Sequence, residues 1–116
     1  MSAASHITIT PAKKRVKVTW RGAVVADSGH ALELREGSYP AAFYIPRADA
    51  DMTKLVKTAH STHCPHKGAA SYFSIRVGDA ASENAIWSYE TPNAGVAAIK
   101  DHLAFYPSRV DAIDVG

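Results

Sequence analysis

The chain has 116 residues, of which 47% are hydrophobic and 21% are charged, and its formal net charge is +2. This composition excludes a disordered chain, and the length is typical of one domain. The positive excess is too small to indicate nucleic-acid binding, and no stretch approaches the roughly 20 apolar residues of a membrane helix, so we expect neither nucleic acid nor a membrane as a partner.

Alternating apolar and polar residues dominate the first half of the chain. The alternation is typical of strands with one buried face and predicts strands at residues 6–10, 16–21, 23–26, 30–36 and 42–45. Arg21 and Gly22 stand between two of these segments and have the composition of a two-residue turn, which predicts a hairpin.

The second half mixes strands with short helices. Asp49 or Asp51 can cap a short helix that continues through Val56, and residues 60–68 are predicted to be a polar loop. Further strands are expected at residues 71–77, 85–90, 103–106 and 110–115, with a second short helix at 96–99. The sum is a mainly β fold of about eight short, mostly antiparallel strands and two short helices.

Cysteine usage favours a cytoplasmic protein. Cys64 is the one cysteine of the sequence, so an intrachain disulfide, common in small secreted domains, is excluded. Residues 1–9 contain no apolar core of signal-peptide length. We expect a single domain over residues 1–116, in which residues 1–14 form a loosely ordered arm.

The densest polar cluster lies in the predicted loop and consists of His60, His63, Cys64, His66 and Lys67. A metal site is one interpretation, because imidazole and thiolate bind zinc. The spacing matches no tetrahedral zinc motif, and adjacent residues such as His63 and Cys64 point apart in an extended chain. We therefore expect no metal and no cofactor.

Cys64 leaves two interpretations open. As a catalytic nucleophile, its thiolate would need a nearby cation such as Lys67 or a protonated histidine. As a structural residue, it would pack as a small hydrophobe before Pro65, in a turn closed by Gly68. The sequence contains no second cysteine, so a two-thiol cycle within one chain is excluded.

A ligand pocket is a further interpretation of this cluster. Trp87 and Tyr89 share one face of a predicted strand, whereas Ser88 and Glu90 share the other. An aromatic pair beside a lysine-bearing loop forms a plausible stacking wall, although aromatic residues on sheets are also common in cores. The expected ligand-binding residues are Arg47, His60, His63, Lys67, Tyr72, Trp87 and Tyr89. Arg47 would pair with an acid or hold an anionic ligand group.

Five stretches resemble one bacterial family. They are VADSGHALEL at 25–34, YPAAFYIPRADADM at 39–52, HSTHCPHKGAASYFSI at 60–75, ENAIWSYETP at 83–92 and HLAFYPSRVD at 102–111. Together they resemble the domain of unknown function 427 (DUF427) family in order and spacing. His66 departs from the family pattern, which usually has an aromatic residue between the proline and lysine of its C-P-x-K-G motif.

The resemblance implies a β-dominated fold with tent-like sheets similar to those of Mss4, and it implies no settled activity. A nucleotidyltransferase-like label accompanies the family, but this chain has neither a paired-aspartate motif beside a glycine-serine turn nor a phosphate-cradling loop. The leading hypothesis is a domain that binds a small molecule near the 60–68 loop and the Trp87–Tyr89 strand. The alternatives are a small enzyme that uses Cys64 or a loop histidine, and an interaction module that pairs as a homodimer.

Overall fold

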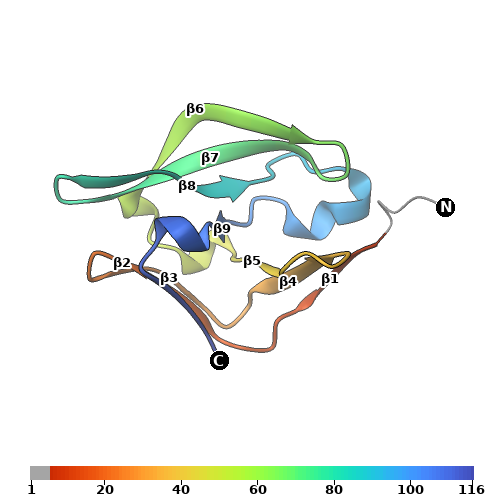
Figure 1. The fold of residues 1–116 in the computed structure, drawn as a ribbon, viewed down its shortest axis with the longest axis horizontal. Helices are drawn as coiled ribbons and strands as arrows, with labels where there is room; N and C mark the ends of the chain where they lie inside the picture. Colours follow the sequence, from red (N-terminus) through yellow and green to blue (C-terminus); the bar gives the residue numbers. More distant parts are fainter. Residues whose placement is uncertain (1–5) are drawn as a thin grey trace.

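The computed structural model describes residues 6–116 and confirms a mainly β fold. Within these residues the chain forms three antiparallel sheets and several 3₁₀ turns (Figure 1). The first sheet contains β1(Ile7–Pro11), β4(Leu32–Glu36) and β5(Ala42–Tyr44). The second contains β10(Ala112–Val115), β2(Val16–Trp20) and β3(Ala23–Ser28). The third contains β6(Leu55–Cys64), β7(Gly68–Val77), β8(Ala80–Ser88) and β9(Ala104–Phe105).

The sheets form two layers. Figure 1 shows the four-stranded sheet across the top of the molecule and the two three-stranded sheets below it. Two short pairings close the space between the layers: Ile45 bridges Leu103, and Ala26 bridges Ala50. Buried side chains fill this space as two clusters.

The first core cluster lies between the β2–β3 hairpin and the four-stranded sheet, and it includes Val18, Val25, Ile75, Ile86 and Leu103. The second core cluster lies towards the β1–β4–β5 sheet and includes Leu34, Tyr44, Tyr72, Tyr89, Val96 and Ile99. Three tyrosines in one cluster are unusual for a purely apolar core, because each buried hydroxyl needs a hydrogen-bond partner. The functional candidates gather around this second cluster.

The β2–β3 hairpin confirms the predicted turn at Arg21 and Gly22. Both residues have positive φ, at 50° and 79°, which is the geometry of a type I′ turn whose twist suits a hairpin. The paired register continues from Trp20 opposite Ala23 to Val16 opposite Ser28, with one irregularity next to Val18.

The predicted helix from Asp49 or Asp51 through Val56 is wrong. The chain makes only the 3₁₀ turn Met52–Lys54, in which the Asp51 carboxylate accepts a hydrogen bond from the Thr53 N–H. Leu55 is buried and already begins β6. A 3₁₀ turn of three residues cannot continue against a strand register that is fixed by pairing with β7.

The predicted polar loop at residues 60–68 is also wrong. β6 runs to Cys64, a turn follows, and β7 begins at Gly68, so this segment is the end of a long hairpin. β6 is an edge strand whose residues are mostly exposed on both faces, so no apolar alternation marks it. The second predicted helix is confirmed as the 3₁₀ segment Ala94–Ile99.

The sequence predicts a loosely ordered arm at residues 1–14, and the structure describes part of this segment. Residues 1–5 lie outside the described residues. Ile7–Pro11 is β1, which pairs in full register with β4. No helix among residues 6–116 is long and apolar enough to cross a membrane.

Candidate functional site

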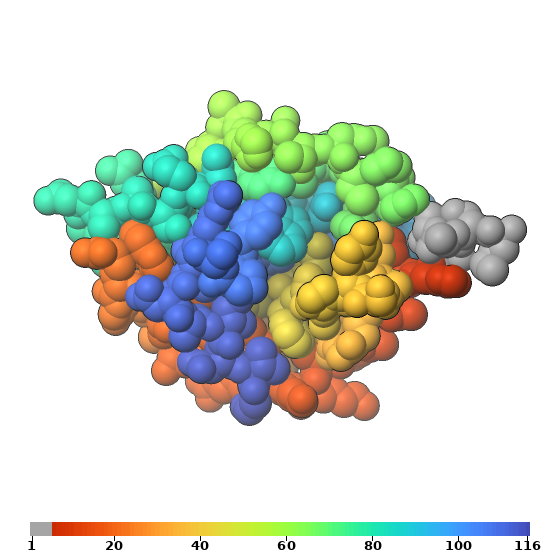
Figure 2. All heavy atoms as spheres, in the orientation of Figure 1, coloured from red at the N-terminus to blue at the C-terminus, as the bar shows by residue number. Residues whose placement is uncertain are grey.

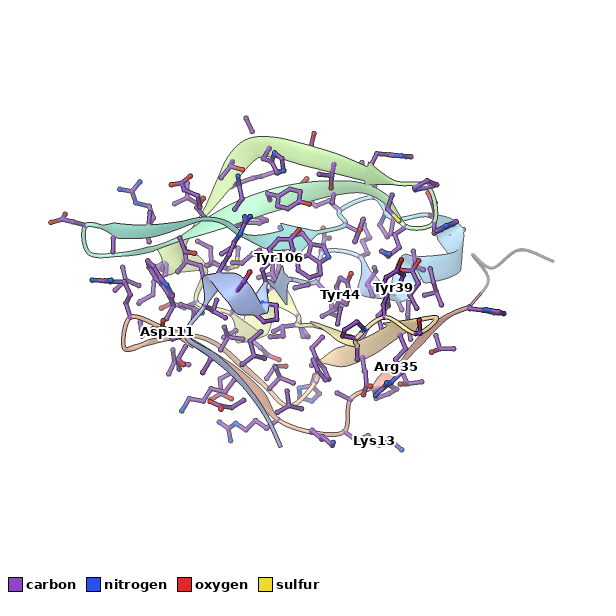
Figure 3. The ribbon with its side chains drawn as sticks, viewed as in Figure 1. Lys13, Arg35, Tyr39, Tyr44, Tyr106 and Asp111 are labelled. Carbon is purple, nitrogen blue, oxygen red and sulfur yellow. The ribbon has the colours of Figure 1, made fainter. Side chains whose placement is uncertain are left out.

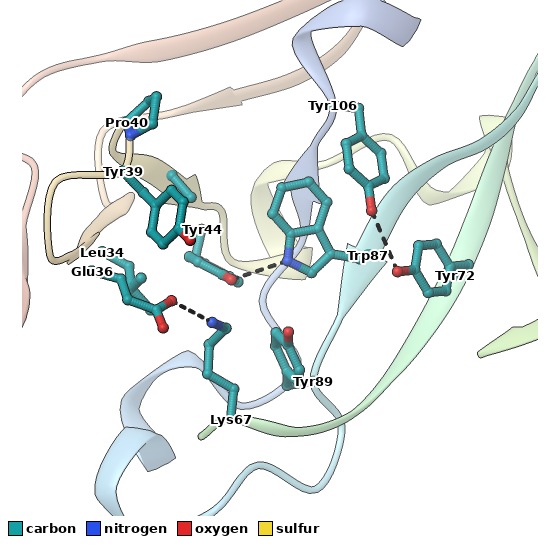
Figure 4. Close-up of a pocket in the computed structure, with 11 residues that line it drawn as sticks. Leu34, Glu36, Tyr39, Pro40, Tyr44, Lys67, Tyr72, Trp87, Tyr89 and Tyr106 are labelled. Atoms are coloured by element: carbon teal, nitrogen blue, oxygen red, sulfur yellow. Dashed lines mark hydrogen bonds and ion pairs between the residues drawn. The ribbon is translucent and has the colours of Figure 1, made fainter. Parts of the chain in front are cut away.

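A cavity of about 510 Å³ opens over the second core cluster. We call it the aromatic cavity, because six of its eleven lining residues are tyrosine or tryptophan (Figure 4). Its walls come from β4, the β4–β5 loop, β5, the β6–β7 turn, β7, β8 and the residue after β9. The lining residues are Leu34, Glu36, Tyr39, Pro40, Ala42, Tyr44, Lys67, Tyr72, Trp87, Tyr89 and Tyr106.

Strand alternation directs Trp87 and Tyr89 to the cavity, as the sequence predicts. Tyr72 lies opposite Trp87 in the β7–β8 register and adds its ring to the same face. Ser88 and Glu90 point the other way, where both bond to Arg47. The aromatic wall is therefore a direct product of the pairing of β7 with β8.

The β6–β7 turn places Lys67 in the cavity wall. Asn93 holds this turn, since its backbone N–H donates to the Lys67 carbonyl at 2.9 Å and its side-chain amide donates to the Pro65 carbonyl at 3.1 Å. Gly68 follows with φ +112°, a conformation that other residues rarely adopt. The turn is thus fixed by contacts with a distant segment.

Lys67 and Glu36 form an ion pair in the aromatic cavity. Lys67 Nζ lies 2.8 Å from Glu36 Oε1, and the side chain of Lys67 is only 12% exposed. Burial lowers the pKa of Lys67, but the hydrogen bond to Glu36 and the negative charge of that carboxylate outweigh it, so the pKa is raised overall. Lys67 is therefore a cation in the folded protein.

The Trp87 indole is held on two sides. Its Nε1 donates to the Tyr44 hydroxyl at 3.0 Å, and its ring lies 4.5 Å from the Tyr106 ring (Figure 4). Tyr44 is 1% exposed. Burial raises the pKa of Tyr44, which keeps its hydroxyl neutral.

A chain of hydroxyl groups leads along the opposite wall. Thr62 Oγ1 lies 2.9 Å from the Tyr72 hydroxyl, which lies 3.3 Å from the Tyr106 hydroxyl. Burial and the hydrogen bond with Tyr72 raise the pKa of Tyr106 to about 12, and burial also raises the pKa of Tyr89. The cavity thus offers neutral hydroxyl groups next to one balanced ion pair.

Four of the seven expected ligand-binding residues line the aromatic cavity: Lys67, Tyr72, Trp87 and Tyr89. His60 does not line it, although its exposed ring lies 4.4 Å from the Tyr72 ring. His63 is exposed on β6 and opposite Ala69. His60, His63 and Lys67 therefore do not converge on one point.

Cys64 is half-buried and packs against the second core cluster. It pairs with Gly68 at the end of the β6–β7 hairpin, and its carbonyl accepts a hydrogen bond from the Lys67 N–H. Packing of this kind fits the structural interpretation of Cys64, and the proximity to Lys67 fits the interpretation as a nucleophile.

Arg47 lies apart from the aromatic cavity and pairs with an acid. Its guanidinium lies 2.9 Å from Glu90 and donates to the Asp101 carbonyl at 2.8 Å. Glu90 also accepts hydrogen bonds from Lys57 and Ser71. These bonds, the one from Lys57 foremost, lower the pKa of Glu90 to about 2.

The expected ligand-binding residues did not include four that line the cavity, namely Glu36, Tyr39, Tyr44 and Tyr106. Figure 3 shows the three tyrosines in the region between the upper sheet and the β4–β5 hairpin. Tyr39 is 73% exposed and belongs to the loop between these strands. The Tyr39–Pro40 pair, which lies between two predicted strands, is the sequence signal that could have indicated this wall.

Among residues 6–116, no three histidine, cysteine or acidic side chains form a group that could hold a metal ion. A family model described as "Domain of unknown function (DUF427)" matches residues 8–116. A search of curated proteins found no match. The matched residues include all eleven that line the aromatic cavity.

Proposed function

This chain belongs to the DUF427 family, and from that premise we propose that it binds a small molecule in the aromatic cavity. The observation that carries the proposal is the Lys67–Glu36 pair in the wall of a cavity lined by aromatic rings. Ligand sites are typically concave and mostly apolar, with a few polar groups that fix orientation. The aromatic cavity has this composition.

The geometry favours a ligand with a flat ring and neutral polar groups. Trp87 and Tyr89 present ring surface to the cavity, and stacking favours a planar partner. Lys67 can donate further hydrogen bonds while Glu36 accepts them, since neither group uses all its bonds in the pair. A ligand group that accepts a hydrogen bond from Lys67 and donates one to Glu36 would satisfy both side chains.

The experiment is an NMR titration of the ¹⁵N-labelled protein with phenol and benzamide as probes. Binding predicts shift changes at the backbone amides of Lys67, Tyr72, Trp87 and Tyr89. Trp87→Ala should abolish the changes, because it removes the ring and the hydrogen bond to Tyr44. Trp20→Phe, a change in the first core cluster, is the matched control and should retain them.

Two results would argue against the proposal. Shift changes confined to residues outside the aromatic cavity would show that the probes bind at another place on the protein. Equal shift changes in the native protein and in the folded Trp87→Ala variant would show that the Trp87 ring is not part of the binding site. Native mass spectrometry of the purified protein adds an independent observation, since a retained small molecule would appear as a discrete added mass.

A further inference from the structure

A second cavity adjoins the aromatic cavity. It measures about 580 Å³ and lies between the segment around residue 40 and the C-terminal strand β10. Figure 2 shows these two segments, gold and blue, facing each other on one side of the molecule. Pro40, Ala42 and Trp87 line both cavities, so one wall is common to them.

The walls of this second cavity, which we call the apolar cavity, are mainly hydrocarbon. Val18 and Ile113 lie opposite each other in the β2–β10 register, and Phe43 and Phe105 come from the other side. Asp111 is the charged residue of the lining, and its carboxylate already accepts a hydrogen bond from the Arg21 N–H at 2.6 Å. The cavity therefore suits an apolar group.

The aromatic cavity selects against net charge. Lys67 and Glu36 balance each other, and burial keeps the hydroxyl groups of Tyr44, Tyr89 and Tyr106 neutral. A ligand group with a net charge would bring an unbalanced charge next to an ion pair that is already balanced. An amide or hydroxyl group brings a donor and an acceptor without net charge, which complements the ion pair.

We propose that the two cavities form one continuous site for a neutral amphiphile, with its amide or hydroxyl head at Lys67 and Glu36 and its hydrocarbon tail in the apolar cavity. The Trp87 indole lies where head and tail join, opposite Tyr39 and Pro40 in Figure 4. This inference rests on the proposed function and names the ligand class for the same site.

The test uses primary alkyl amides of four to eight carbons, from butyramide to octanamide, with octanoate as the charged counterpart. Trp20→Phe leaves Trp87 as the one tryptophan, so its fluorescence reports binding. Each methylene that enters the apolar cavity should tighten binding about fourfold. Octanoate should bind more weakly than octanamide, because it carries a net charge.

Ala112→Trp tests the tail site by filling the apolar cavity from β10. Because this variant and its control each add a tryptophan, their binding is read from the backbone amide NMR shifts of Lys67 and Trp87 instead of fluorescence. The variant should remove the dependence on chain length and leave butyramide binding intact. Ala81→Trp, at an exposed position of β8, is the matched control and should behave like the native protein. Ala41→Phe, from the loop that lines the apolar cavity, provides a second variant if Ala112→Trp does not fold.

The outcomes separate the inference from the proposed function. Binding of benzamide and butyramide without any gain from longer chains would overturn the inference and leave the proposed function standing. No response of Trp87 to any amide or to benzamide would overturn both. A mass that doubles with protein concentration, and that Ala112→Trp returns to the monomer, would assign the apolar cavity to a second copy of the chain and overturn the inference.

Discussion

Lys67 Nζ lies 2.8 Å from Glu36 Oε1, and this contact joins two segments that are 31 residues apart in the chain. One partner comes from the β6–β7 turn and the other from the end of β4. The pair therefore links the four-stranded sheet to the β1–β4–β5 sheet across the aromatic cavity. Stability and ligand binding should both depend on it.

Glu36→Gln should lower the free energy of unfolding by about 1–2 kcal/mol, because it leaves the mostly buried Lys67 ammonium without its counter-charge. Lys67→Met should cost less, since the remaining Glu36 carboxylate is 25% exposed and can be hydrated. Urea unfolding at pH 7 measures both. Lys100→Met, at an exposed position, is the control and should change little. Equal stability of Glu36→Gln and the native protein would show that the pair contributes nothing.

Tyr44→Phe should destabilise the protein by about 1–2 kcal/mol, because the partly buried Trp87 indole N–H loses its acceptor, the hydroxyl of the buried Tyr44. Trp87→Phe removes the donor as well as ring area. In a double-mutant cycle the two changes should couple by about 1 kcal/mol, which isolates the hydrogen bond. A coupling energy near zero would contradict the role of this bond in holding the cavity wall.

Local patterns predicted the fold where one face of a strand is buried. The β2–β3 hairpin and the opposite faces of Trp87 and Ser88 followed from alternation and turn chemistry. β6 was missed because it is an edge strand exposed on both faces, so its sequence shows no alternation of apolar and polar residues. The sequence of an edge strand is free to be polar throughout.

The sequence predicted the candidate site on its β7–β8 side and at Lys67 in the β6–β7 turn. Trp87 and Tyr89 are two residues apart, so their shared face follows from strand periodicity, and Tyr72 joins them because β7 and β8 pair as neighbours in the chain. Glu36 and Tyr44 come from β4 and β5, and only tertiary pairing brings them to the same cavity. Nothing in the local sequence around either residue indicates a partner in a different sheet.

Glu90 should contribute stability that is lost in acid. Its folded-state pKa of about 2 lies below the ordinary value of 4.5, so its contribution is present above about pH 4.5 and is lost as the pH falls towards 2. Glu90→Gln should lower stability at pH 6 by about 1–2 kcal/mol, a value reduced from the full shift because the group is partly exposed. The difference from the native protein should shrink by pH 3. Urea unfolding at both pH values checks this, with the exposed Glu83→Gln as control.

Alkylation of Cys64 separates its two interpretations. Because the side chain is half-buried against the second core cluster, iodoacetamide should react more slowly with the native protein than with the urea-unfolded chain. Cys64→Ser should leave benzamide binding unchanged. Faster alkylation of the native protein, lost in Lys67→Met, would instead favour the interpretation of Cys64 as a nucleophile.

Gly68→Ala should destabilise the protein and displace Lys67. Gly68 has φ +112°, and a Cβ there would lie 3.3 Å from the Thr91 carbonyl oxygen and 3.4 Å from the Asn93 nitrogen, so both strain and crowding oppose the change. The expected loss is about 1–3 kcal/mol. Gly29→Ala is the matched control: Gly29 does not need positive φ and has open space, so the change should be neutral or slightly stabilising. Because Asn93 holds the same turn, Gly68→Ala should also weaken benzamide binding. A stable Gly68→Ala variant with native affinity would show that the turn does not fix the position of Lys67.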